Sequence, residues 1–314
     1  MININNINVL SLFDGISGGN IALQRAGITV KNYYASEIDE YAIKIATKNY
    51  PNIIKLGDIK TLNVDGLHNI DLLLGGSPCQ GFSIAGKRME FKDERSSLIK
   101  YYFHILEKLK PKYFLLENVY MSDKCEQYIS NKLNVKPIKI NSSVFSAQNR
   151  PRNYWTNIPQ TKLITDENIL LKDILINKVG NKYKLSDKMK FKLVKRGEGS
   201  VRYSLYNYNK AYRIMDINKK CVCLDTAQGG GRTPYVEINQ DGTVRTDYTL
   251  KDTHIKHGAR KLTPIECERL QTLPDNYTKS VSDSQRYKMI GNGWTIDVIS
   301  YLLSNINILH NKTN

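Results

Sequence analysis

Residues 71–83 read DLLLGGSPCQGFS, and the rest of the chain is arranged around them. An apolar run that begins at Leu72 and stops at two glycines is typical of a buried parallel strand. Pro78 fixes the backbone φ angle just before Cys79. Open α/β sheets bind ligands at the carboxyl ends of their strands, and this cysteine follows such an end. A buried, inert thiol is the usual alternative, but the neighbours here are turn-forming and polar. The stretch therefore predicts an α/β fold with a reactive thiol at a strand end.

Length and cysteine content indicate the general class of protein. The chain has 314 residues, enough for a main domain and a smaller one. No apolar run is long enough to span a membrane and no signal peptide is evident, so we expect a cytoplasmic protein with no membrane partner. Five cysteines, an odd number, argue against a disulfide framework.

The charge of the chain indicates a polyanionic partner. The net charge is +16, and residues 177–259 hold 17 Lys and Arg against 8 Asp and Glu. A general bias toward lysine is the alternative explanation, but it would not concentrate charge in one quarter of the chain. The distribution favours nucleic acid as the partner.

Three strand ends outline a pocket for an adenosine group. A strand expected over 7–13 leads into a glycine turn over 14–19 and then a helix, but the spacing is neither that of dinucleotide enzymes nor that of a P-loop. Glu37 ends the second strand, where it can accept hydrogen bonds from ribose hydroxyls; taken alone, it would read as a helix cap. Asp58 and Ile59 follow the third strand and suit the amino group and the ring face of adenine. An adenosine site without a phosphate site fits S-adenosylmethionine better than NAD or ATP.

Two segments add polar groups near the expected thiol. Glu117 ends the strand expected over 113–116 and is a candidate acid. Arg150 and Arg152 flank a proline on extended chain, which suits contacts to a phosphate or a base edge. Arginines solvated on a surface turn are the alternative.

The segment that follows the cysteine is unusually long for a connection between a strand and a helix. Residues 80–97 are polar and basic and contain two glycines. We expect this loop to close over the substrate and to carry Lys87 and Arg88 to phosphates. A disordered insertion is the alternative.

The last two-fifths of the chain change character twice. Residues 177–259 have poor periodicity, many tyrosines and a Gly-Gly-Gly-Arg run that ends at Arg232, and they predict a small, mostly β domain. Cys221 and Cys223 lack the further Cys or His that a metal site needs, so no metal is expected. Thr263 then begins a helix with a capping box, and a final helix is expected over 295–308.

Together these motifs resemble the carbon-5 cytosine DNA methyltransferase family over residues 9–155 and 260–308. Any one of them could arise by chance, but they occur in the family's order. The matching blocks are Phe13-Asp14-Gly15 through Gly19, Glu37, Asp58-Ile59, Pro78-Cys79-Gln80, Glu117-Asn118-Val119, Gln148-x-Arg150-x-Arg152, Arg260-x-Leu-Thr-Pro and Gly291-Asn292.

The resemblance implies three sets of site residues. It makes Cys79 the nucleophile, Glu117 the group that binds the cytosine ring, and Arg152, with Arg150, the group that holds the base oxygen and the backbone. The implied cofactor-binding residues are Phe13, Asp14, Gly15, Gly18, Gly19, Glu37, Ile38, Asp58, Ile59, Pro78, Leu98 and Asn292. The implied DNA-binding residues are Gln80, Ser83, Lys87, Arg88, Cys223, Leu224, Gly230, Gly231 and Arg232. The family often has a Thr-Leu pair where this chain offers only Cys223-Leu224 as the nearest match.

The resemblance also implies a fold and a reaction. The fold is a Rossmann-like methyltransferase domain with a mixed, mostly parallel sheet over 1–176 and 290–314, a mostly β target-recognition domain over 177–259, and a connecting segment over 260–289. The implied reaction moves a methyl group from S-adenosyl-L-methionine to carbon 5 of a flipped-out cytosine in double-stranded DNA and leaves S-adenosyl-L-homocysteine. We expect a monomer that acts in restriction-modification or in solitary or phage modification.

Three other functions compete with this one. An RNA (tRNA) cytosine-5 methyltransferase uses the same scaffold. A catalytically silent DNA-binding relative would not need the intact Pro-Cys-Gln and Glu-Asn-Val motifs. A nicotinamide oxidoreductase would need the phosphate-binding glycines that this chain lacks.

Overall fold

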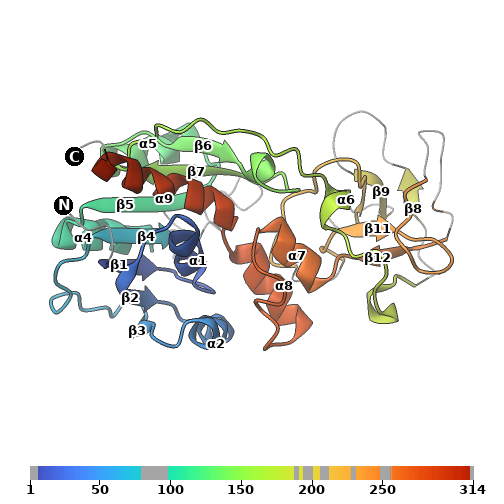
Figure 1. The fold of residues 1–314 in the computed structure, drawn as a ribbon, viewed down its shortest axis with the longest axis horizontal. Coiled ribbons are helices and arrows are strands. Elements are labelled where there is room, and N and C mark those ends of the chain that lie inside the picture. Colours follow the sequence, from blue (N-terminus) through green and yellow to red (C-terminus); the bar gives the residue numbers. More distant parts are fainter. Residues whose placement is uncertain are drawn as a thin grey trace. The chain divides into compact units, whose positions relative to one another are not determined.

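The computed structural model divides the chain into two compact units (Figure 1). It describes residues 6–78, 98–186, 191–193, 201–205, 212–227, 231–247, 255 and 257–311. The first unit comprises Met1–Asn141, Pro151–Leu163 and Ile296–Asn314, and the second comprises Ser142–Arg150 and Ile164–Thr295. The second unit thus starts earlier than 177 and also holds 260–289, whereas the functions assigned to these ranges stay predictions.

The first unit is built on a seven-stranded sheet in the order β3-β2-β1-β4-β5-β7-β6. Strands β1 to β5 run parallel, and β7 is antiparallel to both β5 and β6. This is the mixed, mostly parallel sheet that the sequence predicts. The strands are β1 Ile7–Leu12, β2 Val30–Ser36, β3 Ile54–Gly57, β4 Leu72–Gly76, β5 Tyr113–Val119, β6 Ile138–Asn141 and β7 Pro151–Thr156.

Helices cover both faces of this sheet, as its apolar central strands require. The helices of the first unit are α1 Gly18–Arg25, α2 Glu40–Asn49, α4 Ile99–Leu109, α5 Asp123–Leu133 and α9 Ile296–Asn311. On one face, Leu10, Leu73 and Leu116 share a buried cluster with residues of α4 and α5. On the other, α1 packs against α9, where a Cβ on Gly18 would come within 2.8 Å of the Ile296 side chain. Figure 1 draws α9 in red beside the sheet.

The two glycines after the apolar run belong to β4 itself. Both lie within the strand and pair with β5, Gly75 opposite Leu116 and Gly76 opposite Glu117. A Cβ on Gly75 would come within 2.7 Å of the Tyr102 ring, and Tyr102 is completely buried. Gly75 is therefore required by the close packing of α4 on the strand.

The second unit contains a five-stranded sheet in the order β12-β11-β10-β9-β8. These strands are short, and all pairs are antiparallel except β10 with β11. They are β8 Phe191–Leu193, β9 Val201–Leu205, β10 Ile214–Met215, β11 Tyr235–Glu237 and β12 Ala259–Lys261. The helices of this unit are α6 Leu171–Ile174, α7 Pro264–Leu270 and α8 Asp283–Asn292.

The predicted capping box begins α7. The Thr263 hydroxyl accepts a hydrogen bond from the Glu266 backbone N–H at 3.2 Å, and the Glu266 carboxylate accepts one from the Thr263 N–H at 2.7 Å. The same carboxylate receives two bonds from Arg260 at 2.7 and 2.9 Å, and both side chains are almost fully buried. The Arg260 motif thus anchors β12 to α7 within the second unit.

Candidate active site

The strand that leads to Cys79 ends beside Glu117. The Cα atoms of Gly76 and Glu117 are paired in the β4–β5 ladder, and the chain is described as far as Pro78. Cys79 itself lies outside the described residues. Asn118 is 1% exposed and donates a hydrogen bond of 2.9 Å from Nδ2 to Ser77 Oγ. The backbone just before the predicted nucleophile is therefore fixed to β5.

Glu117 and Arg152 form an ion pair across β5 and β7. Arg152 Nε lies 2.9 Å from Glu117 Oε1, and the two side chains are 13% and 12% exposed. Arg152 also donates to the Pro151 carbonyl at 2.8 Å, which fixes the guanidinium in place. The structure thus brings two of the predicted catalytic side chains together. A carboxylate next to a guanidinium presents both an acceptor and donors to a pyrimidine edge.

Arg150 makes a different set of contacts, and its predicted catalytic role stays a prediction. It belongs to the second unit, is 4% exposed, and donates to the carbonyls of Leu224, Gly291 and Gly293 at 3.1, 3.1 and 2.8 Å. Its guanidinium is occupied inside that unit. Arg152 lies within β7, whereas Arg150 precedes Pro151, the first residue of that strand, so the alternation along β7 does not place the two side chains together.

Glu37 joins the ends of the first two strands. Its Oε2 accepts a hydrogen bond from the Gly15 N–H at 2.8 Å, and its Oε1 accepts from the N–H groups of Ile38 and Asp39 at 2.7 and 2.8 Å. Gly15 has a φ of +59° and nothing within 4 Å of where a Cβ would be. The carboxylate shapes the glycine turn, and Oε2 retains one acceptor position for a ligand hydroxyl.

Asp14 holds the turn from within. Its carboxylate accepts hydrogen bonds from the Ser17 hydroxyl and, at 2.7 Å, from the Tyr33 hydroxyl. Burial raises the pKa of Asp14 from 3.8 to about 6, although the bonds from Ser17 and Tyr33 oppose this rise. These hydrogen bonds make Asp14 a support of the turn, and its predicted contact with the cofactor stays a prediction.

Gly18 and Gly19 are also explained by packing. Gly19 lies against Tyr33, whose hydroxyl would be 2.4 Å from a Cβ at this position. Gly18 faces Ile296 of α9, as described above. Close packing therefore accounts for both glycines, and their predicted contact with the cofactor stays a prediction.

The third strand end supplies an acceptor that is still open. One oxygen of Asp58 accepts from the Lys60 N–H at 2.9 Å, and the other has no partner among the described residues. Ile59 is 6% exposed and packs in the core cluster, so it offers little surface to an adenine ring. Ile38 is 69% exposed and is the better candidate for that contact.

The remaining predicted cofactor residues lie in different parts of the fold. Phe13 has a positive φ of 58° and packs, partly buried, against the core cluster together with Leu98, which precedes α4. Pro78 is the last residue described before Cys79. Asn292 is exposed at the end of α8, in the second unit. The sequence places Gly291 and Asn292 at the start of the last helix, whereas the structure ends α8 there and begins α9 at Ile296.

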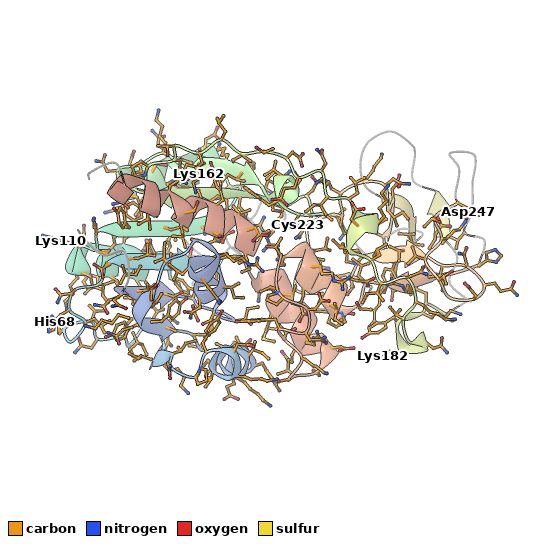
Figure 2. The ribbon with its side chains drawn as sticks, in the orientation of Figure 1. His68, Lys110, Lys162, Lys182, Cys223 and Asp247 are labelled. Carbon is orange, nitrogen blue, oxygen red and sulfur yellow. The ribbon has the colours of Figure 1, made fainter. Side chains whose placement is uncertain are left out.

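Only four of the predicted DNA-binding residues are described. Gln80, Ser83, Lys87, Arg88 and Gly230 lie outside the described residues. Cys223, which Figure 2 labels, is half-buried, and Leu224 is 6% exposed. Arg232 Nε lies 3.5 Å from Asp225 Oδ2. Gly231 has a φ of +61° and contacts Tyr212. Leu224 is therefore a core side chain, whereas Cys223 and Arg232 keep accessible surface.

Sequence reasoning missed several residues that build these sites. Tyr33 and Ser17 hold Asp14, and Asn118 holds Ser77, but each is an ordinary polar residue of a strand or turn with no sequence pattern of its own. Gln148 stood in the quoted motif without a role. It donates to Gln271 Oε1 at 3.1 Å and accepts from the Leu224 N–H at 2.7 Å.

Among the described residues, no three His, Cys, Asp or Glu side chains are grouped so that they could hold a metal ion. Within the same residues, no helix has the length and apolar character that crossing a bilayer demands.

Comparison with known proteins connects these sites to a family. The model of the C-5 cytosine-specific DNA methylases matches residues 7–307. The Type II methyltransferase M1.ScrFI of Lactococcus lactis subsp. cremoris is 30% identical over 93% of this chain and 75% of its own length. The Type II methyltransferase M.HpaII of Haemophilus parainfluenzae is 31% identical over 92% of this chain and 86% of its own.

Solved structures support the fold. The Dnmt2 methyltransferase of S. pombe matches with a TM-score of 0.73 at 20% identity, over 97% of this chain and 99% of its own. The Entamoeba histolytica methyltransferase EhMeth also gives 0.73, at 18% identity and the same coverage. Since the family model spans nearly the whole sequence, this chain belongs to the C-5 cytosine-specific DNA methylase family.

Proposed function

We propose that the protein transfers a methyl group from S-adenosyl-L-methionine to carbon 5 of a cytosine in double-stranded DNA, through a covalent bond to Cys79. The observation that carries this proposal is the Glu117–Arg152 pair at 2.9 Å, next to the strand end that leads to Cys79. Membership of the family makes the protein a DNA cytosine-5 methyltransferase. The site residues, the cofactor and the biological role go beyond this membership and are part of the proposal.

The role follows from the relatives. Those at about 30% identity are named Type II methyltransferases, and we propose that this enzyme likewise protects DNA in a restriction-modification system. An orphan methyltransferase of Bacillus phage rho11s is 34% identical over 51% of this chain, so a solitary role is the second candidate. The tRNA methyltransferase alternative is not favoured by these relatives.

The strand ends of the first unit fit S-adenosyl-L-methionine. Gly15 leaves open space at the first turn, Glu37 Oε2 has an acceptor position for a ribose hydroxyl, and Asp58 has a carboxylate oxygen without a partner among the described residues. The exposed Ile38 adds an apolar surface suited to a purine. When bound, this cofactor supplies an electrophilic methyl group.

Cytosine needs help from the protein because its carbon 5 is a poor nucleophile. Addition of the Cys79 thiolate to carbon 6 forms a C–S bond and moves electron density to carbon 5. Arg152 is suited to stabilise charge on the base carbonyl oxygen, and Glu117 to bind the N3 side of the ring. After methylation a base removes the proton from carbon 5, and the C–S bond breaks to regenerate the thiolate.

The base has to leave the duplex to meet these groups. Extrusion of a stacked base costs a few kcal/mol, and binding in the pocket has to offset that cost. The polar and basic segment 80–97 is proposed to enclose the extruded base, but it lies outside the described residues.

Radiolabelled methyl transfer tests the proposal. We expect the purified protein to label duplex DNA and not tRNA, and bisulfite sequencing to place the label on cytosine within one sequence motif. Cys79→Ser is expected to lower turnover by about a thousandfold or more while duplex binding persists, because the alcohol ionises far less readily than the thiol. Labelled tRNA with unlabelled DNA, or a fully active Cys79→Ser enzyme, would overturn the proposal.

A further inference from the structure

Arg150 joins two segments of the second unit that are far apart in sequence. Its Nη1 donates to the Leu224 carbonyl at 3.1 Å and lies 3.4 Å from Cys223 Sγ. Its Nη2 donates to the carbonyls of Gly291 and Gly293 at 3.1 and 2.8 Å. At 4% exposure the guanidinium holds protein backbone and has little surface for a phosphate.

Gln148 fixes the same segment from the neighbouring position. Its Oε1 accepts from the Leu224 N–H at 2.7 Å, and its Nε2 donates to the Leu270 carbonyl and to Gln271 Oε1 at 3.0 and 3.1 Å. Its backbone forms a parallel bridge with Cys221. Gln148 is completely buried, so a change that removes these bonds leaves unpaired polar groups inside the unit.

Gly291 packs against the backbone of the same segment. A Cβ on this residue would lie 1.9 Å from the Asp225 carbonyl oxygen, which no real structure permits. The segment from Cys221 to Asp225 is thus held by Gln148 and Arg150 and passes directly against Gly291. Within it the Leu224 side chain is buried, while Cys223 and Asp225 keep accessible surface.

We propose that Gln148 and Arg150 are positioning residues that fix the segment Cys221–Asp225 and thereby determine which DNA sites are methylated. This inference rests on the proposed function. Each wrong base pair in a site normally costs about 1–3 kcal/mol of binding free energy. The protein keeps that difference when the side chains that contact the bases are held in one geometry. A segment released from its two supports can adjust, and it loses that discrimination.

Kinetics on a panel of duplexes test this role. The wild-type motif is first read by bisulfite sequencing, and kcat and KM are then measured on duplexes with that motif and with each single-base change. Arg150→Lys and Gln148→Met keep side-chain length but lose part of the bonding. We expect about tenfold or greater loss of discrimination and a raised KM for DNA. Binding of S-adenosyl-L-homocysteine is expected to stay within about twofold of wild type.

Matched controls come from residues of the same types. Arg269 pairs with Asp275 at the surface and Gln160 bonds to Asn305, so Arg269→Lys and Gln160→Met are expected to leave discrimination unchanged. Cys223→Val removes the sulfur that accepts from Arg150 and should relax site choice, whereas Cys223→Ser keeps an acceptor and should relax it less. This pair decides the question even if Arg150→Lys or Gln148→Met fails to fold.

The outcomes separate this inference from the function on which it rests. Variants that lose only thermal stability, with unchanged discrimination, would overturn the positioning role. So would a fall in kcat alone, which indicates direct contact with the cytosine. A wild-type protein that methylates no DNA overturns the proposed function, and with it this inference.

Discussion

Glu117 and Arg152 neutralise each other in a partly buried place, so each has a ready partner before any base arrives. The ion pair holds both side chains in one geometry. In the proposed function, the polar edge of the cytosine binds between or beside these two side chains. The pairing does not follow from the spacing of the motif, because it depends on β7 running antiparallel to β5. The contacts of Arg150 do not follow from it either, because they are made to Leu224, Gly291 and Gly293, which are distant in the chain.

Glu117→Gln tests the carboxylate at this site. The amide keeps the size of the side chain but cannot carry the charge or the proton, and we expect kcat to fall by about 10²–10⁴-fold. Affinity for duplex DNA should change little, since the backbone contacts remain. Asp275→Asn breaks the exposed pair with Arg269 and serves as the control. Equal effects of the two changes on kcat would contradict a role for Glu117 in the reaction.

Asp14 gives the protein a pH-dependent contribution to stability. Burial raises its pKa from 3.8 to about 6, so between those values the folded protein holds a proton that the unfolded chain has released. The contribution of Asp14 to the free energy of unfolding therefore falls as pH rises from about 4 to about 6, and above that range this contribution no longer changes with pH. The sign is opposite to that of a salt-bridged carboxylate.

Asp14→Asn removes this dependence. The difference in unfolding free energy, variant minus wild type, should increase by about 1–3 kcal/mol between pH 4.5 and pH 7.5. The lost hydrogen bonds add an offset to this difference, but the test reads only its change with pH. Urea denaturation at several pH values measures this difference. Asp241 is exposed, and bonds from Thr243 lower its pKa, so Asp241→Asn should give a nearly flat line over the same range. A flat line for Asp14→Asn would refute the assignment.

At the scale of elements, packing explains features that local sequence suggests are turns or ligand contacts. The sequence predicts β1, β2, β3 and the helices α1, α7 and α9, because apolar periodicity and caps are local. It overlooks α8, whose polar sequence DSQRYKMIGN has a glycine in its last turn and little apolar pattern. It does not reveal the close packing at Gly18, Gly19 and Gly75, since the residues they accommodate are distant in the chain.

Gly75→Ala tests the contact between α4 and β4. The added methyl group would lie 2.7 Å from the buried Tyr102 ring, and we expect a loss of about 1–3 kcal/mol in unfolding free energy. Gly66 has nothing within 4 Å of a Cβ, so Gly66→Ala is the matched control and should be close to neutral. Thermal unfolding of the three proteins compares them directly. Equal midpoints would show that α4 moves away without cost.

At the scale of the whole molecule, the sequence predicts the fold class and the family, whereas the compact units follow contacts between segments that are distant in the chain. The order of the motifs is a property of the linear chain, and it carries the family assignment. The compact units are not linear: Ser142–Arg150 belongs to the second unit although it lies between two strands of the first. No local pattern reports such an excursion, because it depends on partners about 75 and 140 residues away.

The net charge of +16 predicts that the affinity for DNA depends strongly on salt concentration. Lysines and arginines that neutralise phosphates release counterions, so the logarithm of the affinity should fall linearly with the logarithm of salt concentration. For about 6–10 phosphate contacts, affinity drops by about 10³–10⁵ between 50 and 200 mM salt. Fluorescence anisotropy with a labelled duplex measures the slope, and titration with S-adenosyl-L-homocysteine in the same buffers is the control. We expect a steep line for DNA and a shallow one for the cofactor product. Equal slopes would mean that the excess positive charge, concentrated in residues 177–259, does not meet the DNA backbone.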